Sequence, residues 1–167
     1  MVCAVGREDG SIVEQVSIPT TEPSRCMPQI LEFFRGKDID ALGVGCFGLL
    51  DLDRSSPSYG SITTTPKLRW RNYPIMRVLG EELGVPVGID TDVNAAALGE
   101  AALGCTQGLD CSMYITVGTG IGVGIIVDGK PHHGVTTAGA ATRSPRSSPK
   151  RWFPSTAYPR PSRAAVS

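Results

Sequence analysis

Apolar residues recur along the first 130 positions in short runs that predict strands and helices in turn. The periodicity predicts strands at residues 2–5, 11–18, 41–44, 85–89, 112–117 and 121–127, and helices at 27–34, 75–83 and 93–103. Asp-Gly pairs at 9–10 and 128–129 are strong hairpin-turn signals. Strands that alternate with helices and hairpins indicate an α/β fold, a mixed sheet with flanking helices.

The helix predicted at residues 93–103 has the strongest support from the sequence. It opens with three consecutive alanines, Ala95 to Ala97, which favour helix, and Gly104 ends it. Asp92 stands where an N-cap residue is expected.

The composition changes after about residue 135. Residues 136–167 consist largely of Ala, Ser, Pro, Arg and Thr without hydrophobic periodicity, which predicts a disordered tail. Nine basic and sixteen acidic residues give residues 1–128 a charge of −7, and residues 129–167 carry +7. The acidic body excludes nucleic acid as an expected partner. Two interpretations of the basic tail stay open, an interaction segment and an out-of-frame end of the coding sequence.

The remaining composition narrows the class of protein. No apolar run is long enough to span a bilayer, and the first residues do not form a secretory signal, so we expect a cytoplasmic protein without a membrane partner. The five cysteines have no CxxC spacing, which argues against disulfides and a self-contained zinc site. Most of them are expected to be small buried hydrophobes.

A glycine-rich segment, YITVGTGIGVG at residues 114–124, is the first candidate for chemistry. One interpretation is a phosphate cradle of backbone N–H groups at Gly118 and Gly120, with hydroxyls from Thr116 and Thr119. The other interpretation is a hairpin whose glycines allow close packing against a neighbouring element. A strand follows the glycines, so this is neither a Rossmann fingerprint nor a Walker loop.

Asp92 is the second candidate, because it lies where a strand ends and a helix begins. Active-site carboxylates of α/β proteins lie at the carboxyl ends of strands, and a helix N-terminus stabilises the anion. Such an aspartate can accept the proton of an alcohol that attacks phosphorus. The alternative is that Asp92 only caps the helix.

Four segments in order resemble the ROK family (repressors, open reading frames, kinases) of bacterial sugar kinases, in its fructokinase-like branch. They are ALGVGCFGLLD at 41–51, GSITTTPKLRW at 60–70, TDVNAAALGE at 91–100 and TVGTGIGVG at 116–124. The resemblance covers residues 2–135. It implies one lobe of an actin/hexokinase-type ATPase, with ribonuclease H-like topology and a cleft for ATP and sugar.

The resemblance also implies a role for individual residues. Glu100 would brace the helix. For Trp70 a core role is favoured over stacking on the sugar. For Asp51 and Asp53 solvation of a loop is favoured over magnesium binding, so no metal ligand is assigned. The implied site is Asp92 as general base, Thr91, Thr65 and Lys67 beside the sugar, and Thr116, Gly118, Thr119 and Gly120 beside the ATP phosphates.

The chain departs from the family pattern at both ends. Family members open with a strand and a first phosphate loop, and they continue past the position of Gly134 with a GH segment, zinc-binding cysteines and a second lobe that carries dimer contacts. None of these motifs is found in the sequence. We therefore expect an incomplete lobe, inactive as given and with exposed apolar surface.

The resemblance thus implies an ATP-dependent hexose kinase that uses Mg²⁺ and converts fructose to fructose 6-phosphate. Thr91 and Lys67 favour fructose, because other branches more often have Asn at these positions. Glucose, mannose and N-acetylhexosamine remain alternative substrates. A non-enzymatic alternative is the sugar-sensing domain of a ROK repressor.

Overall fold

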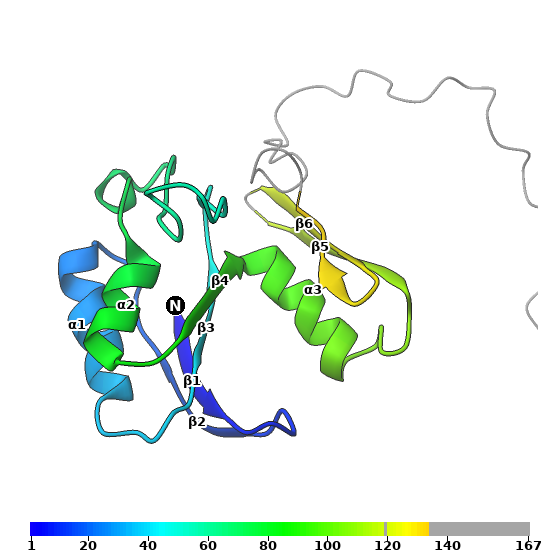
Figure 1. Ribbon diagram of the computed structural model, residues 1–167, viewed down its shortest axis with the longest axis horizontal. Coiled ribbons are helices and arrows are strands. Elements are labelled where there is room, and N and C mark those ends of the chain that lie inside the picture. Colours follow the sequence, from blue (N-terminus) through cyan, green and yellow to red (C-terminus); the bar gives the residue numbers. More distant parts are fainter. Residues whose placement is uncertain (119, 134–167) are drawn as a thin grey trace, which may run out of the picture.

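The computed structural model describes residues 1–118 and 120–133, and Figure 1 shows its elements. Every predicted helix and strand is present in this part of the chain. The elements are β1 (Val2–Gly6), β2 (Ile12–Ser17), α1 (Pro23–Phe34), β3 (Leu42–Cys46), the 3₁₀ helix η1 (Leu68–Trp70), α2 (Ile75–Leu83), β4 (Val87–Thr91), α3 (Asp92–Leu103), β5 (Cys111–Val117), β6 (Ile121–Val127) and β7 (Lys130–Pro131). The predicted tail at 136–167 lies outside the described residues.

The strands form three hydrogen-bonded sheets in the described part of the chain. β1 and β2 pair antiparallel around the predicted Asp-Gly turn, and β3 and β4 pair parallel. β5, β6 and β7 form an antiparallel sheet. Parallel and antiparallel pairs therefore both occur, as expected, but among residues 1–118 and 120–133 they do not join into one sheet.

Helices α1 and α2 lie side by side against one face of the first two ladders (Figure 1). The apolar positions of both helices point inward, and the core they form includes Cys3, Ile30, Phe34, Leu50, Ile62, Trp70 and Leu79. Helix α1 begins at Pro23, four residues before the predicted start. Proline is favoured in the first helical turn, whereas the exposed Ser24 and Arg25 give no periodic signal.

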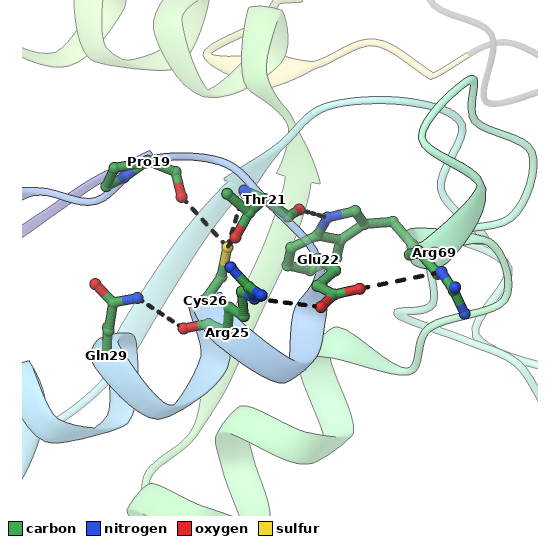
Figure 2. Close-up of polar contacts among 8 residues, drawn as sticks. Pro19, Thr21, Glu22, Arg25, Cys26, Gln29 and Arg69 are labelled. Atoms are coloured by element: carbon green, nitrogen blue, oxygen red, sulfur yellow. Dashed lines mark hydrogen bonds and ion pairs between the residues drawn. The ribbon is translucent and has the colours of Figure 1, made fainter.

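The segment before α1 is held by polar contacts rather than by a side-chain cap, since Glu22 makes no capping bond (Figure 2). The buried Cys26 Sγ accepts the backbone N–H of Thr21 at 3.1 Å and lies 3.4 Å from the carbonyl oxygen of Pro19. Trp70 donates its indole N–H to the carbonyl of Thr21 at 2.6 Å. These bonds attach the β2–α1 connection to η1 and confirm Trp70 as a core residue.

Helix α3 lies between the two halves of the molecule, with the β3–β4 ladder on one side and the β5–β6 hairpin on the other (Figure 1). Its buried residues are Val93, Asn94 and Ala97, whereas Leu98 and Leu103 are exposed. A Cβ atom on Gly45 would lie 2.9 Å from that of Ala95, and one on Gly122 would lie 2.8 Å from Val93 Cγ1. A Cβ on Gly124 would overlap the carbonyl group of Val93. Glycine is therefore required at these three strand positions, where α3 comes closest.

The exposure of the cysteines agrees with the expectation that most of them are buried. Cys3, Cys26 and Cys46 are buried, whereas Cys105 and Cys111 are exposed. Exposed apolar side chains occur on β2 (Ile12, Val13) and on β5 (Met113, Ile115, Val117). Among the described residues, no helix has the length and hydropathy that crossing a bilayer requires.

The close approach of α3 to β6 predicts the effect of a single methyl group. Gly124→Ala places a Cβ onto the backbone of Val93, and because backbone cannot rotate away, we expect a loss of about 1–3 kcal/mol in the free energy of unfolding. Urea denaturation measures it. Gly88→Ala on β4 is the matched control, since its Cβ meets nothing within 4 Å. Equal stability of both variants would contradict this packing.

Candidate functional site

A cleft of about 750 Å³ opens at the carboxyl ends of β3 and β4. Parallel strands end at the same edge of a sheet, so the turns after them converge there. The cleft is lined by Phe47, Gly48, Leu49, Thr64, Thr65, Pro66, Lys67, Arg71, Thr91, Asp92, Val93, Gly122 and Val123. Four of the predicted site residues, Thr65, Lys67, Thr91 and Asp92, therefore share one cavity although they come from two separate segments.

Asp92 is the first residue of α3, and its side chain is exposed to the cleft. Its Oδ1 accepts the N–H of Val93 at 2.9 Å, the one hydrogen bond of this carboxylate within the described ranges. The prediction that Asp92 is the N-cap was wrong, because Thr91 occupies that position and its hydroxyl accepts the N–H of Asn94 at 3.2 Å. The helix is thus capped by the neighbouring threonine, and the aspartate is left free to face the cleft.

A polar network behind Asp92 joins three segments. Asp90 Oδ1 accepts the N–H of Thr91 at 2.7 Å and the side-chain amide of the buried Asn94 at 2.8 Å. Its Oδ2 lies 2.7 Å from Nε2 of His133, which follows β7. The network connects the end of β4, the start of α3 and the residue that follows the β5–β6–β7 sheet. It therefore fixes the position of Thr91, which bonds to Asp90.

Thr65 and Lys67 face Asp92 from the loop that follows Ile62. Thr65 is buried, and its Oγ1 accepts the N–H of Lys67 at 3.2 Å. The ammonium group of Lys67 lies 4.3 Å from the ring centroid of Phe47, a cation–π contact that holds it at the rim of the cleft. Thr65, Lys67 and Asp92 therefore line the same cleft.

The pKa of Cys46 reports on the charges of the cleft. Burial of this thiol and, to a lesser extent, the negative charge of Asp92 raise its pKa to about 12, while the positive charge of Lys67 acts in the opposite direction. Both charges therefore act on one point at the end of β3. The thiol itself stays neutral near pH 7 and is a packing group, as expected for a buried cysteine.

The glycine-rich hairpin contains glycines in two different surroundings. Gly122 and Gly124 are packing glycines against α3, whereas a Cβ on Gly118 or Gly120 would meet nothing within 4 Å. The N–H of Gly118 donates to the carbonyl of Gly120 at 2.9 Å, which closes the turn. Thr116, Gly118 and Gly120 are not part of the cleft lining, and Thr119 lies outside the described residues.

The structure adds several residues that the sequence did not single out. Arg71 lines the cleft together with Lys67. It follows Lys67 by four positions in the same segment, and this short distance in sequence is the signal that could have indicated Arg71. Phe47, Val93 and Val123 give the cleft apolar walls, and no motif marks them.

Other acidic residues serve the local structure of their own segments. Asp51 accepts hydrogen bonds from the hydroxyls of Ser56 and Ser58, and Asp53 accepts one from the hydroxyl of Ser55. Glu100 accepts a hydrogen bond from the backbone N–H of Cys105. These hydrogen bonds lower the pKa of all three carboxyl groups. Residues 1–118 and 120–133 contain no group of three or more His, Cys, Asp or Glu side chains able to hold a metal ion.

Comparison with known proteins places the chain in a family. The ROK family model matches residues 1–142. "Putative fructokinase" of Bacillus subtilis (strain 168) is 47% identical over 135 residues, 81% of this chain and 45% of the relative. Fructokinase of Zymomonas mobilis is 44% identical over 124 residues, 71% of this chain and 41% of the relative.

A solved structure gives the same result. The ROK family glucokinase of Streptomyces griseus in complex with glucose and AMPPNP superimposes with a TM-score of 0.65 at 31% identity, over 83% of this chain and 44% of that one. This confirms the expected α/β fold of the actin/hexokinase type. The chain spans less than half the length of these relatives. Since the family model matches most of its residues, the chain belongs to the ROK family.

Proposed function

We propose that the cleft is the sugar side of a kinase active site and that the whole protein transfers the γ-phosphoryl group of ATP to a hexose, converting fructose to fructose 6-phosphate. The observation that carries the proposal is the meeting of Asp92, Thr91, Thr65 and Lys67 in one cleft. An exposed carboxylate in a cleft can accept the proton of an alcohol that binds within hydrogen-bond reach of it.

Asp92 acts as the general base in this proposal. Its free oxygen accepts the proton of the sugar hydroxyl while the hydroxyl oxygen forms a bond to the γ-phosphorus. The bond from the γ-phosphorus to the bridging oxygen breaks, and ADP leaves with that electron pair. The N-terminus of α3 stabilises the carboxylate before the proton arrives. The hydrogen bond from Val93 fixes its orientation.

The remaining residues of the cleft position the two substrates. Thr91, Thr65 and Lys67 are proposed to bind sugar hydroxyls, with Phe47 as an apolar wall. The hairpin of Thr116, Gly118, Thr119 and Gly120 is proposed to contact the ATP phosphates, because its turn has open space for close approach. Mg²⁺ is bound chiefly through substrate phosphates and water, so it enters as part of the Mg·ATP substrate rather than through a protein cage.

Fructose is the proposed sugar because relatives named fructokinase are 47% and 44% identical to the chain, whereas the superimposed glucokinase is 31% identical. Residues 2–135 are proposed to be one structural unit of this kinase, followed by a separate tail. We propose that the reaction takes place in the cytoplasm.

The role of Asp92 is tested in a chimera, since the chain spans less than half of its relatives. Residues 1–133 replace the matching part of Zymomonas mobilis fructokinase, and a coupled assay measures ATP-dependent fructose phosphorylation. Asp92→Asn keeps the size of the side chain but removes the base, so we expect kcat to fall about 10²- to 10⁴-fold with little change in KM for ATP. Asp110→Asn, an exposed carboxylate outside the cleft, is the control. Retained kcat in Asp92→Asn would contradict the assignment.

Sugar selectivity is tested at the N-cap of α3. Thr91→Asn keeps a good capping residue, so the helix start should be preserved. The amide adds a donor beside the sugar, and we expect the ratio of kcat/KM for fructose over glucose to fall about tenfold in the same chimera. Thr91→Ser, which keeps the hydroxyl, should change this ratio little. An unchanged ratio in Thr91→Asn would show that residue 91 does not contact the sugar.

A further inference from the structure

Two adjacent histidines, His132 and His133, follow β7 and differ in what they contact. Within the described ranges the side chain of His132 makes no hydrogen bond or ion pair, and its backbone N–H donates to the carbonyl of Ile125 at 2.8 Å. The side chain of His133 reaches Asp90, 43 residues earlier, with Nε2 at 2.7 Å from Oδ2. One histidine is therefore a connecting side chain, and its neighbour is an exposed side chain for comparison.

The contact between His133 and Asp90 joins two parts of the molecule that are otherwise held by packing. In the part of the chain that the structure describes, it is the one hydrogen bond or ion pair between residues 1–103 and residues 111–133. Elsewhere α3 meets the β3–β4 ladder and the β5–β6 hairpin through small apolar groups (Figure 1). Apolar packing is non-directional, whereas a hydrogen bond requires a particular distance and angle. The contact therefore selects one arrangement of the two sheets among those that packing allows.

The carboxylate of Asp90 extends this constraint to the start of α3. Its Oδ1 accepts the backbone N–H of Thr91 at 2.7 Å and the side-chain amide of Asn94 at 2.8 Å. Asn94 is buried, and its own backbone N–H donates to the hydroxyl of Thr91. One oxygen of Asp90 thus holds the β4–α3 junction while the other holds His133. The junction carries Asp92, two residues further along.

The direction of the hydrogen bond follows from the chemistry of its partners. An ionised carboxylate only accepts hydrogen bonds, so Nε2 of His133 is the donor to Asp90. The Nε2–H group donates in both the neutral and the charged form of imidazole. The contact therefore does not require His133 to be charged.

The position of His133 along β6 places this contact close to the glycine-rich turn. β7 pairs antiparallel with β6, and the bond from His132 to Ile125 continues that register past the last strand residue. One residue further, the register sets His133 beside Gly124. The start of β6 at Ile121, where the turn ends, is then roughly 10 Å away along the strand. The contact lies between the turn and the start of α3.

We propose that Asp90 and His133 are positioning residues that hold the glycine-rich turn of the β5–β6 hairpin and the carboxylate of Asp92 at a fixed separation. The inference rests on the proposed function, in which Asp92 accepts the proton of the sugar and the turn contacts the ATP phosphates. Neither Asp90 nor His133 lines the cleft, so they act through Thr91 and the hairpin rather than on the substrates.

Phosphoryl transfer makes this separation important for turnover. The attacking oxygen and the γ-phosphorus must lie about 3–3.5 Å apart and in line, and a misplacement of about 1 Å can lower the rate roughly 10²-fold. The sugar lies on the side of α3 and the phosphates on the side of the hairpin. Loss of the joint therefore disturbs the alignment of the two substrates while it leaves the residues that bind each of them in place.

The effect on turnover is tested in the Zymomonas mobilis chimera that carries residues 1–133. His133→Ala removes the donor to Asp90, so we expect kcat to fall about tenfold, with KM for fructose and for ATP within about twofold of the unsubstituted chimera. His133→Gln places an amide N–H close to the position of Nε2 and should restore kcat to within about threefold. His132→Ala, which removes the exposed neighbour, is the matched control and should leave kcat unchanged.

The kinetics distinguish failure of this inference from failure of the proposed function. The inference is overturned if kcat of His133→Ala equals that of His132→Ala, if KM rises by the factor by which kcat falls, or if His133→Gln restores nothing. Retained kcat in Asp92→Asn would instead contradict the proposed function.

The positional part of the inference is tested without activity in the 167-residue chain. Residual dipolar couplings of backbone amides report the orientation of the β5–β6 hairpin relative to the β3–β4 ladder. We expect both to fit one common alignment in the unsubstituted chain and in His132→Ala, whereas in His133→Ala the hairpin should require an alignment of its own. A common alignment in His133→Ala would overturn the inference, whatever the kinetics show.

Discussion

The contact between the first turn of α3 and glycine residues of two strands is the constraint on which the rest of the structure depends. Gly45 of β3 and Gly122 and Gly124 of β6 have no side chains, and this lets the backbone of Val93 and the methyl group of Ala95 lie directly against strands. A helix this close to both ladders fixes where its N-terminus points. The N-terminus carries Asp92, so the packing of small residues determines the position of the charged one.

The same contact explains why the cleft is formed by segments far apart in the sequence. β4 ends at Thr91 and α3 starts at once, so the capping hydroxyl and the exposed carboxylate are neighbours at the helix start. The Asp90 network then ties His133 to this junction. Thr65 and Lys67 approach from the other wall, and the charges of Lys67 and Asp92 both affect the pKa of Cys46.

Much of this could be predicted from the sequence, for identifiable physical reasons. Helix α3 was predictable because alanine and leucine favour helix locally, and the β5–β6 hairpin because each residue pairs with one nearby. The meeting of Thr65 and Lys67 with Asp92 followed from the family resemblance rather than from spacing. The start of α1 and the capping role of Thr91 were not predicted, because both depend on backbone geometry that residue types do not specify. Nor did the sequence separate packing glycines such as Gly124 from open ones such as Gly118, since that distinction arises only against α3.

The central claim is that α3 presents the Asp92 carboxylate to the hydroxyl of a bound hexose. A crystal structure of the Zymomonas mobilis chimera carrying residues 1–133, with fructose bound, tests this claim most directly. The account predicts fructose between Thr65 and α3, with its 6-hydroxyl about 2.6–3.2 Å from a carboxylate oxygen of Asp92. Fructose bound outside the cleft, or with Asp92 turned away from every hydroxyl, would contradict it.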